Sequence, residues 1–257
     1  MKSLKESAVI AMDGSGEELF PFLPYILQDL WEIGTDPEIV IRLIRQRFEK
    51  PAELRLLDLG CGKGAVSVKT AQALKCRCHG IDAIPEFIEF ARQKARALKI
   101  GRHCTFEVGD IREKAKNFTD RDVLVLGAIG PVFGNYLATL RTLSPCLSEK
   151  GVLIIDDGYI EDSSNFRHPL IQKQGLIMKH IEAAGMEVLE EIVVEKETLR
   201  KDDQNIFSQL EKRCRELMDQ YPGKRHLFLD YICRQEKEND VLENKIIAAV
   251  LMIGRKH

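Results

Sequence analysis

The chain has 257 residues, of which 44% are hydrophobic and 30% charged, and its formal net charge is −2 at pH 7. This length can bury a large core, and the near-neutral charge argues against nucleic acid as the main partner, because nucleic-acid-binding domains usually carry a basic surplus. The seven cysteines are scattered without zinc-site spacing, which favours reduced thiols. Apolar runs stay well short of the ~20 residues of a membrane span. We therefore expect a cytoplasmic protein that does not enter membranes.

Two helices are expected before the first strand. Apolar positions between residues 17 and 31 follow a helical stripe, with a firm helix from Pro24 onward. A second helix is expected from about residue 36 to 48, with Pro37 in its first turn. Residues 1–13 show little periodicity. The apolar stripes of the two helices either pack on the sheet or form the roof of a ligand pocket.

A strand, a glycine turn and a helix follow one another between residues 54 and 74. The strand is apolar except for Arg55 and Asp58, residues 60–64 read Gly-Cys-Gly-Lys-Gly, and helical spacing begins at Val66. Glycine accepts positive φ and has no Cβ, and the start of the helix offers unpaired N–H groups. The segment therefore predicts a site where a charged or polar ligand meets the backbone. The glycine spacing alone also fits a dinucleotide turn.

Six further strands are expected along the chain, at residues 76–82, 105–108, 122–126, 152–157, 186–195 and 246–253. Helical segments alternate with the first six strands, which predicts a mainly parallel sheet with helices on both faces. The second strand ends in Asp82, about twenty residues after the glycines, where a carboxylate can accept bonds from ribose hydroxyls. About fifty residues separate the last two strands, and they show two helical stripes broken at Pro222.

These features together resemble the Rossmann-like S-adenosylmethionine-dependent methyltransferases. The resemblance rests on the acid-glycine motif of the first turn, on Asp82, on Gly109-Asp110-Ile111 after the third strand and on the loop at Gly127. It implies a doubly wound, seven-stranded α/β sheet whose last strand lies antiparallel between the fifth and sixth, and S-adenosylmethionine as the cofactor. It also implies a cofactor site formed by Asp58, Gly60, Cys61, Gly62, Gly64, Asp82, Ala83, Gly109, Asp110, Ile111, Gly127 and Ala128.

Three parts are expected: an N-terminal helical cap over residues 1–50, a methyltransferase core over 51–198 and 244–257, and a helical insertion over 199–243. The insertion is expected to form either a lid over the acceptor or a dimer contact, so the chain is a monomer or a homodimer. The apolar character of both additions favours a small-molecule acceptor in an enclosed pocket. Its walls are expected to come from Tyr25, Trp31, Phe228 and Tyr231.

The expected chemistry is in-line displacement at the sulfonium methyl, which depends on positioning and on the exclusion of water. A hydroxyl or ammonium acceptor also needs a base, and the candidates are Asp157, Tyr159 and His168. No metal is expected, because metal-dependent catechol-type enzymes need a further acid near Gly127, which is absent. The alternatives are a nicotinamide-dependent oxidoreductase, which leaves Asp58 unexplained, and a methyltransferase acting on protein or RNA.

Overall fold

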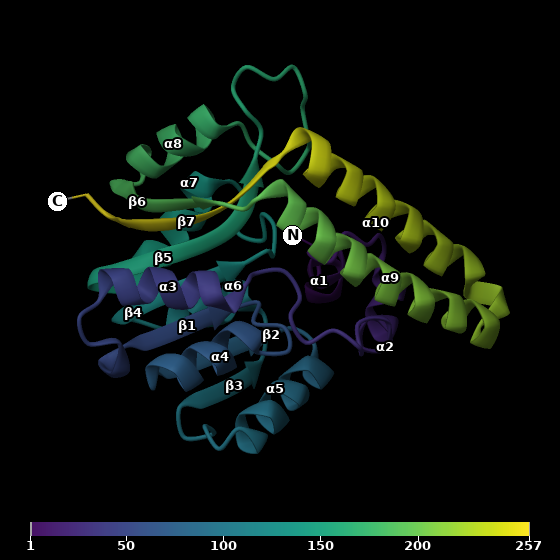
Figure 1. The fold of residues 1–257 in the computed structure, drawn as a ribbon, viewed down its shortest axis with the longest axis horizontal. Helices are drawn as coiled ribbons and strands as arrows, with labels where there is room; N and C mark the ends of the chain where they lie inside the picture. The colour runs from purple at the N-terminus through teal and green to yellow at the C-terminus, as the bar shows by residue number, and fades with distance from the viewer. Residues whose placement is uncertain (1, 257) are drawn as a thin grey trace.

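A seven-stranded sheet runs through the computed structural model, which describes residues 2–256 (Figure 1). The strands lie in the order β3-β2-β1-β4-β5-β7-β6. The first five strands in this order are parallel to one another, and β7 runs antiparallel to both β5 and β6. The predicted fold and the place of the last strand are thus confirmed. The strands are β1 (Arg55–Leu59), β2 (Arg77–Asp82), β3 (Cys104–Val108), β4 (Arg121–Gly127), β5 (Leu147–Tyr159), β6 (Met186–Val193) and β7 (Ile247–Arg255).

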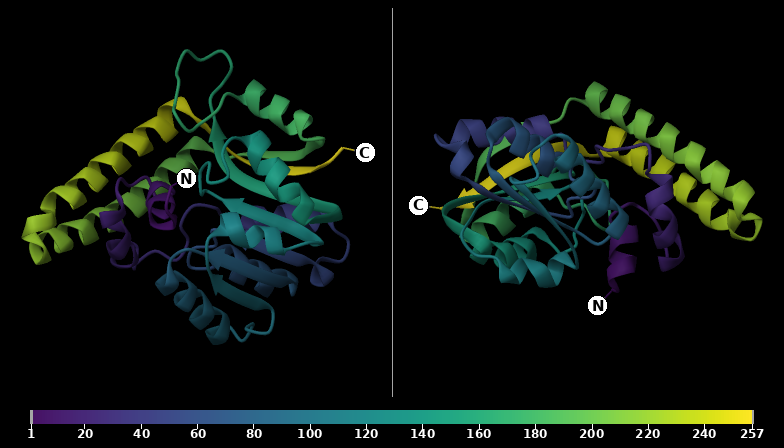
Figure 2. Two further views of the ribbon diagram at one scale, coloured as in Figure 1. Left: turned by 180° about the vertical axis from the view of Figure 1, so that it is seen from behind. Right: turned by 90° about the horizontal axis from the view of Figure 1, so that it is seen from below.

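Helices cover both faces of this sheet (Figures 1 and 2). Successive residues of a strand point to opposite faces, and in β1 the buried Leu56 and Leu57 accordingly belong to two different apolar cores. The first core packs under α3 (Pro37–Arg47), α4 (Ala65–Leu74) and α5 (Pro85–Ala97), and the second under α6 (Ile111–Lys114), α7 (Tyr136–Leu143) and α8 (Gln174–Ala183). The order of strands reverses between β1 and β4, where ligands bind beyond the carboxyl ends of such sheets.

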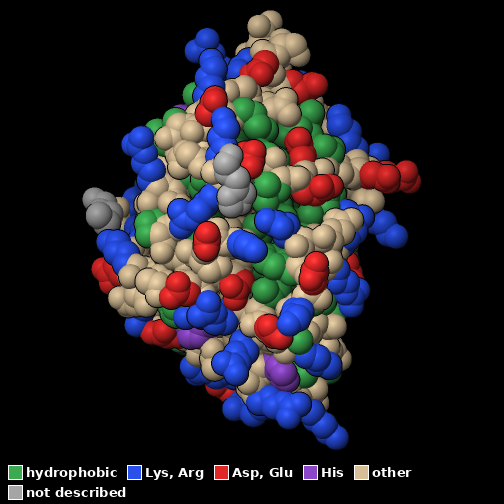
Figure 3. Space-filling model, turned by 90° about the vertical axis from the view of Figure 1, so that its left-hand side faces the viewer, with side chains coloured by type: hydrophobic (Ala, Val, Ile, Leu, Met, Phe, Trp, Pro, Cys, Tyr) green, Lys and Arg blue, Asp and Glu red, His purple; other side chains and the backbone are tan. Residues whose placement is uncertain are grey.

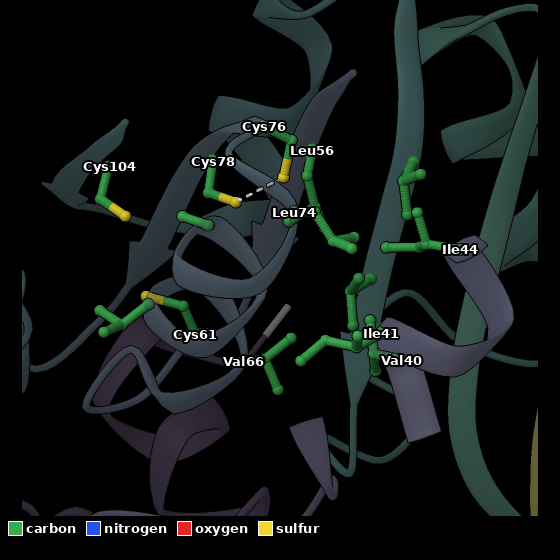
Figure 4. Close-up of a cluster of buried hydrophobic side chains, with 14 of the residues drawn as sticks. Val40, Ile41, Ile44, Leu56, Cys61, Val66, Leu74, Cys76, Cys78 and Cys104 are labelled. Atoms are coloured by element: carbon green, nitrogen blue, oxygen red, sulfur yellow. Dashed lines mark hydrogen bonds between the residues drawn. The ribbon is translucent and has the colours of Figure 1, made fainter. Parts of the chain in front are cut away.

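The first core contains four of the seven cysteines, Cys61, Cys76, Cys78 and Cys104 (Figure 4). All four are buried free thiols, and the sulfur atoms of Cys76 and Cys78 lie 3.7 Å apart. They pack among the apolar side chains of α3 and α4. We therefore assign these thiols a packing role.

A third apolar core lies beside the sheet and joins the N-terminal segment to the residues between β6 and β7. It is formed by α1 (Leu4–Ile10), α2 (Leu23–Ile26) and the hairpin of α9 (Lys196–Gln220) and α10 (Arg225–Lys245). Figures 1 and 2 show the hairpin projecting beyond the sheet, with the N-terminal helices between the two. We call this assembly the cap. Its two long helices correspond to the stripes expected before the last strand.

The N-terminal segment departs from expectation in two places. The helix expected from Pro24 to residue 31 ends at Ile26, because the carbonyl groups of Leu27 and Leu30 turn to the buried ammonium of Lys63. A helix also forms at residues 4–10, where periodicity is weak, and the Ser3 hydroxyl caps it by accepting from the Glu6 N–H at 3.0 Å. The helix expected near residue 36 is confirmed as α3, and it packs on the sheet.

The surface matches the balanced composition. On the face shown in Figure 3, acidic and basic side chains are interspersed, with apolar side chains between them. Within residues 2–256, no helix is both long and apolar enough to cross a membrane.

Candidate active site

The glycine turn between β1 and α4 has the geometry of a ligand cradle. Its three glycines, Gly60, Gly62 and Gly64, have backbone φ angles of 77°, 51° and 74°. Residues that carry a side chain rarely adopt such angles. A Cβ at Gly64 would lie 2.7 Å from the Cβ of Ala91, whereas one at Gly62 would meet no atom within 4 Å. The turn is therefore packed against α5 on one side and open on the other.

Two buried acids stand beside this turn. Asp58 is 2% exposed and accepts a hydrogen bond of 2.7 Å from the Ser67 hydroxyl. Burial raises the Asp58 pKa to about 6, and the nearby Asp82 adds to the effect. The Asp82 carboxylate accepts from the N–H groups of Gly62 and Ile84, both at 2.9 Å, and burial raises its pKa as well. Within residues 2–256, no cationic side chain pairs with either carboxylate, so the two acids suit a ligand that brings an ammonium group and hydroxyls.

The remaining predicted cofactor residues lie around the same end of the sheet. The Gly109 N–H donates to the Asp82 carbonyl at 2.9 Å, and the Ala83 N–H bonds to the Asp82 carboxylate. Asp110 is engaged by the Arg112 guanidinium at 2.9 and 2.6 Å, which lowers the Asp110 pKa. A cofactor contact of Asp110 therefore stays a prediction, and the cofactor would have to share this carboxylate with Arg112. The flanking Cys61 and Ile111 are buried in the cores.

The turn after β4 is covered by the N-terminal segment. A Cβ at Gly127 would lie 2.5 Å from the Thr35 hydroxyl oxygen, and one at Gly34 would lie 2.7 Å from the Cβ of Ala128. Ala128 itself has a φ of 51°. The next residue, Ile129, reaches across to β1, because a Cβ at Gly60 would lie 2.6 Å from its side chain. One side chain thus separates the glycine turn from the loop after β4.

Lys63 is a site residue that the sequence analysis did not single out. It lies within the glycine turn and is only 4% exposed, and its ammonium donates to the carbonyls of Leu27 and Leu30 at 2.5 and 2.6 Å. In return, the Trp31 indole N–H donates to the Lys63 carbonyl at 3.2 Å. Burial lowers the Lys63 pKa to about 8. The sequence offered one indication of this residue, a charged side chain between two glycines. Lys63 ties the glycine turn to residues 27–30, which follow α2.

A hollow opens at the carboxyl ends of β4 and β5. Asp156, Asp157 and Tyr136 of α7 all belong to its lining. Successive residues of β5 point to opposite faces of the sheet, so only the Asp157 side chain lies on the same face as Ile155 and Tyr136. Burial raises the Asp156 pKa to about 6, and burial also raises the pKa of Asp157. Ile129, which contacts the glycine turn, is part of the same lining. The hollow is lined by Leu126, Ile129, Gly130, Pro131, Gly134, Tyr136, Thr139, Ile155, Asp156, Asp157, Leu170 and Gln172.

Of the three predicted bases, Asp157 lines this hollow and the other two lie elsewhere. Tyr159 is buried in the second core and donates to Glu191 at 2.8 Å, and burial raises its pKa to about 12. His168 accepts at Nδ1 from the N–H groups of Leu170 and Ile171, at 3.3 and 3.2 Å. The structure thus leaves Asp157 as the candidate base beside the hollow.

The four predicted pocket walls lie in two different apolar cores. Phe228 and Tyr231 are 0% and 2% exposed in the cap core, and Tyr25 packs against that core while its hydroxyl donates to Glu216 at 2.8 Å. Trp31 packs instead against the first core of the sheet. None of the four belongs to the lining of the hollow, and their role as walls of an acceptor pocket stays a prediction.

The glycine turn, the acid at the end of β2 and the antiparallel β7 together define a Rossmann-like methyltransferase. A family model described as a methyltransferase domain matches residues 50–214, so the chain belongs to this family. The predicted class of methyltransferase is thereby confirmed.

Known proteins similar to this chain agree with the family. A malonyl-[acyl-carrier protein] O-methyltransferase of Bacillus cereus is 25% identical over 135 residues, which are 52% of this chain and 45% of that protein. The chain thus spans less than half the length of this curated relative.

Solved structures show the fold over most of the chain. A methyltransferase from Thiobacillus denitrificans, in complex with S-adenosylhomocysteine, has a TM-score of 0.74 at 16% identity and covers 91% of this chain and 98% of its own. The [4+2]-cyclase SpnF has a TM-score of 0.71 at 18% identity, and the match covers 98% of this chain and 96% of the cyclase chain. The presence of a cyclase shows that the fold by itself does not determine the reaction.

Proposed function

We propose that this chain transfers a methyl group from S-adenosylmethionine to a small-molecule acceptor by in-line displacement in a covered pocket. The observation that carries the proposal is the adjacency of two sites at the reversal of strand order. The open glycine turn with Asp58 and Asp82 lies on one side of Ile129, and the hollow with Asp157 lies on the other. A donor and an acceptor bound at these two places are neighbours.

The residues of the first site fit the cofactor. Asp82 has acceptor capacity beyond its bonds to backbone N–H groups and is proposed to hold the ribose hydroxyls. Asp58 is proposed to face the ammonium of the amino-acid end, because a buried carboxylate gains from a cationic partner. When bound, the cofactor supplies an electrophilic methyl group on a sulfonium.

The cap is proposed to act as a lid. Contacts far apart in the sequence tie its two halves: the Arg213 guanidinium pairs with Asp29 at 2.6 Å, and Tyr25 donates to Glu216. The cap also connects to the glycine turn through Lys63. Closing over an acceptor would exclude water, and such exclusion strengthens the electrostatic interactions within the site. A protein or RNA acceptor would instead require a wide opening at this edge.

Methyl-labelled S-adenosylmethionine tests the proposal. The full chain is incubated with the label and, separately, with a cellular extract below about 1 kDa, with cellular protein and with cellular RNA. We expect label in the small-molecule fraction, and we expect the variant Asp82→Asn to reduce it. Label found only in the protein or RNA fraction would overturn the proposed acceptor class. Absence of label in all three would overturn methyl transfer itself.

Measuring the molecular mass of the chain in solution distinguishes a lid from a dimer contact. The variant Arg213→Ala removes the ion pair with Asp29 and leaves the fold of the sheet untouched. A lid predicts a monomer for both wild type and variant, with reduced turnover in the variant. A wild-type dimer that the variant dissociates, with turnover retained, would favour the interface.

A further inference from the structure

Building on the proposed function, we infer that Lys63 is a positioning residue, which makes the cover over the turn after β4 depend on cofactor binding. This cover is formed by residues 27–36, which we call the strap. The strap runs from the end of α2, beside the cap, to the start of α3 on the sheet (Figure 1). Lys63 belongs to the glycine turn, so it connects the proposed cofactor site to the strap.

The Lys63 side chain holds the start of the strap. Its ammonium is buried and donates to the carbonyls of Leu27 and Leu30 at 2.5 and 2.6 Å. It also lies over the rings of Phe87 and Phe90, 5.6 and 5.0 Å from their centroids, and aromatic faces attract cations. Removing an ammonium from water costs free energy, and these partners offset that cost. The two carbonyls are therefore fixed by the conformation of the glycine turn.

The main chain of Lys63 makes a second attachment to the strap. The Trp31 indole N–H donates to the Lys63 carbonyl at 3.2 Å. The Trp31 side chain is half-buried, and Lys94 Nζ of α5 lies 4.6 Å from the centroid of its ring. A single residue of the glycine turn thus binds the strap through both its side chain and its backbone.

The other end of the strap covers the turn after β4. Gly127 has no room for a Cβ because the Thr35 hydroxyl oxygen would lie 2.5 Å from it, and Gly34 packs equally closely on Ala128. Thr35 is only 3% exposed. The covered turn continues into Ile129, which lines the hollow proposed for the acceptor. The position of the strap therefore determines whether this side of the acceptor site is closed.

A ligand on Asp82 would act on Lys63 through the neighbouring glycine. The Gly62 N–H donates to the Asp82 carboxylate at 2.9 Å, and the space beside Gly62 is open. Glycines with positive φ precede and follow Lys63, and glycine gives the backbone unusual freedom. A ligand that fixes the turn removes this freedom, so less entropy is lost when the strap closes on Lys63. Because such coupling is reciprocal, the closed strap also retains the cofactor.

Quenching of tryptophan fluorescence by acrylamide tests the inference, because Trp31 is the single tryptophan of the chain. Binding of S-adenosylhomocysteine to the full chain is first measured by calorimetry, and quenching is then recorded without ligand and at saturation. We expect saturating ligand to lower the quenching constant about twofold, as coupling to the turn closes the strap over the ring. Ligand that binds without lowering this constant would overturn the inference. Absence of binding would contradict the proposed cofactor site, and the inference with it.

The variant Lys63→Met keeps the length of the side chain and removes its donors. We expect it to bind S-adenosylhomocysteine about fivefold more weakly or worse, and its Trp31 quenching to be the same with and without ligand. The side chains of Leu27 and Leu30 remain in the cap core, so the cap itself should stay packed. The matched control Lys94→Met removes a cation beside the same ring but leaves the turn intact, and it should respond as wild type does. A Lys63→Met protein that behaves like this control would overturn the role of Lys63.

Proteolysis gives a second measurement that needs only the wild-type chain. Chymotrypsin cleaves after aromatic residues, and cleavage after Trp31 requires the strap to leave the turn. The masses of the two fragments identify this cut. We expect saturating S-adenosylhomocysteine to slow it, and an unchanged rate of cleavage with bound ligand would overturn the inference.

Discussion

The glycine turn and the cap are held together in different ways. At the turn, Asp58 bonds to Ser67 and Gly62 bonds to Asp82, partners that lie 9 and 20 residues apart. In the cap, Tyr25 bonds to Glu216, a partner 191 residues away. The glycine turn is thus held by partners that lie close in the sequence, whereas the cap joins the N-terminal segment to residues 196–245. Substitutions in the cap core should therefore leave the affinity for the cofactor unchanged. Substitutions in the glycine turn should leave the packing of the cap unchanged.

The largest effect is expected from truncating the cap core. Phe228 is fully buried, so Phe228→Ala should cost about 3–5 kcal/mol of stability through lost burial and a cavity. Denaturant unfolding measures this loss, and Leu229→Ala, at the exposed neighbouring position, is the matched control. Affinity for S-adenosylhomocysteine under native conditions should change little. A parallel loss of that affinity would show that the two regions are one unit.

The two acids predicted to bind the cofactor should differ in their effects. Asp82→Asn should weaken S-adenosylhomocysteine binding about tenfold to a hundredfold, since hydrogen bonds to a buried carboxylate are lost or weakened. Asp110→Asn should have a smaller effect, because Arg112 already occupies that carboxylate. Calorimetry measures both variants. Equal losses would mean that Asp110 exchanges Arg112 for the ligand.

The smallest effect concerns pH. The Asp58 pKa of about 6 in the folded chain exceeds its ordinary value of 3.8, so its neutral form favours folding. This contribution to stability is complete below about pH 4 and is lost as the pH rises through 6. Binding of an ammonium requires the ionised form, so cofactor affinity should instead rise between pH 5 and 7. Titration of wild type and Asp58→Asn checks both trends, and an equal pH response in the variant would assign the effect to another group, such as Asp156.

The difference between the two regions also explains what could be read from the sequence. The strands, the glycine turn and Asp82 follow from local spacing, and the structure confirms the sheet they predict. The irregular stretch after Ile26 could not be predicted locally, because it depends on Lys63 more than thirty residues away. Tyr136 and Asp157 likewise come from a helix and a strand that meet only in the folded chain, where both residues line the hollow. Local patterns thus predict the cofactor site, whereas the proposed acceptor site depends on tertiary contacts.

A crystal structure of the full chain with S-adenosylhomocysteine tests the central claim most directly. The account predicts the ribose on Asp82, the amino-acid end at the glycine turn beside Asp58, and the sulfur facing the hollow that contains Asp157. A ligand bound away from the turn, or one whose sulfur faces away from Asp157, would contradict the assignment of adjacent donor and acceptor sites.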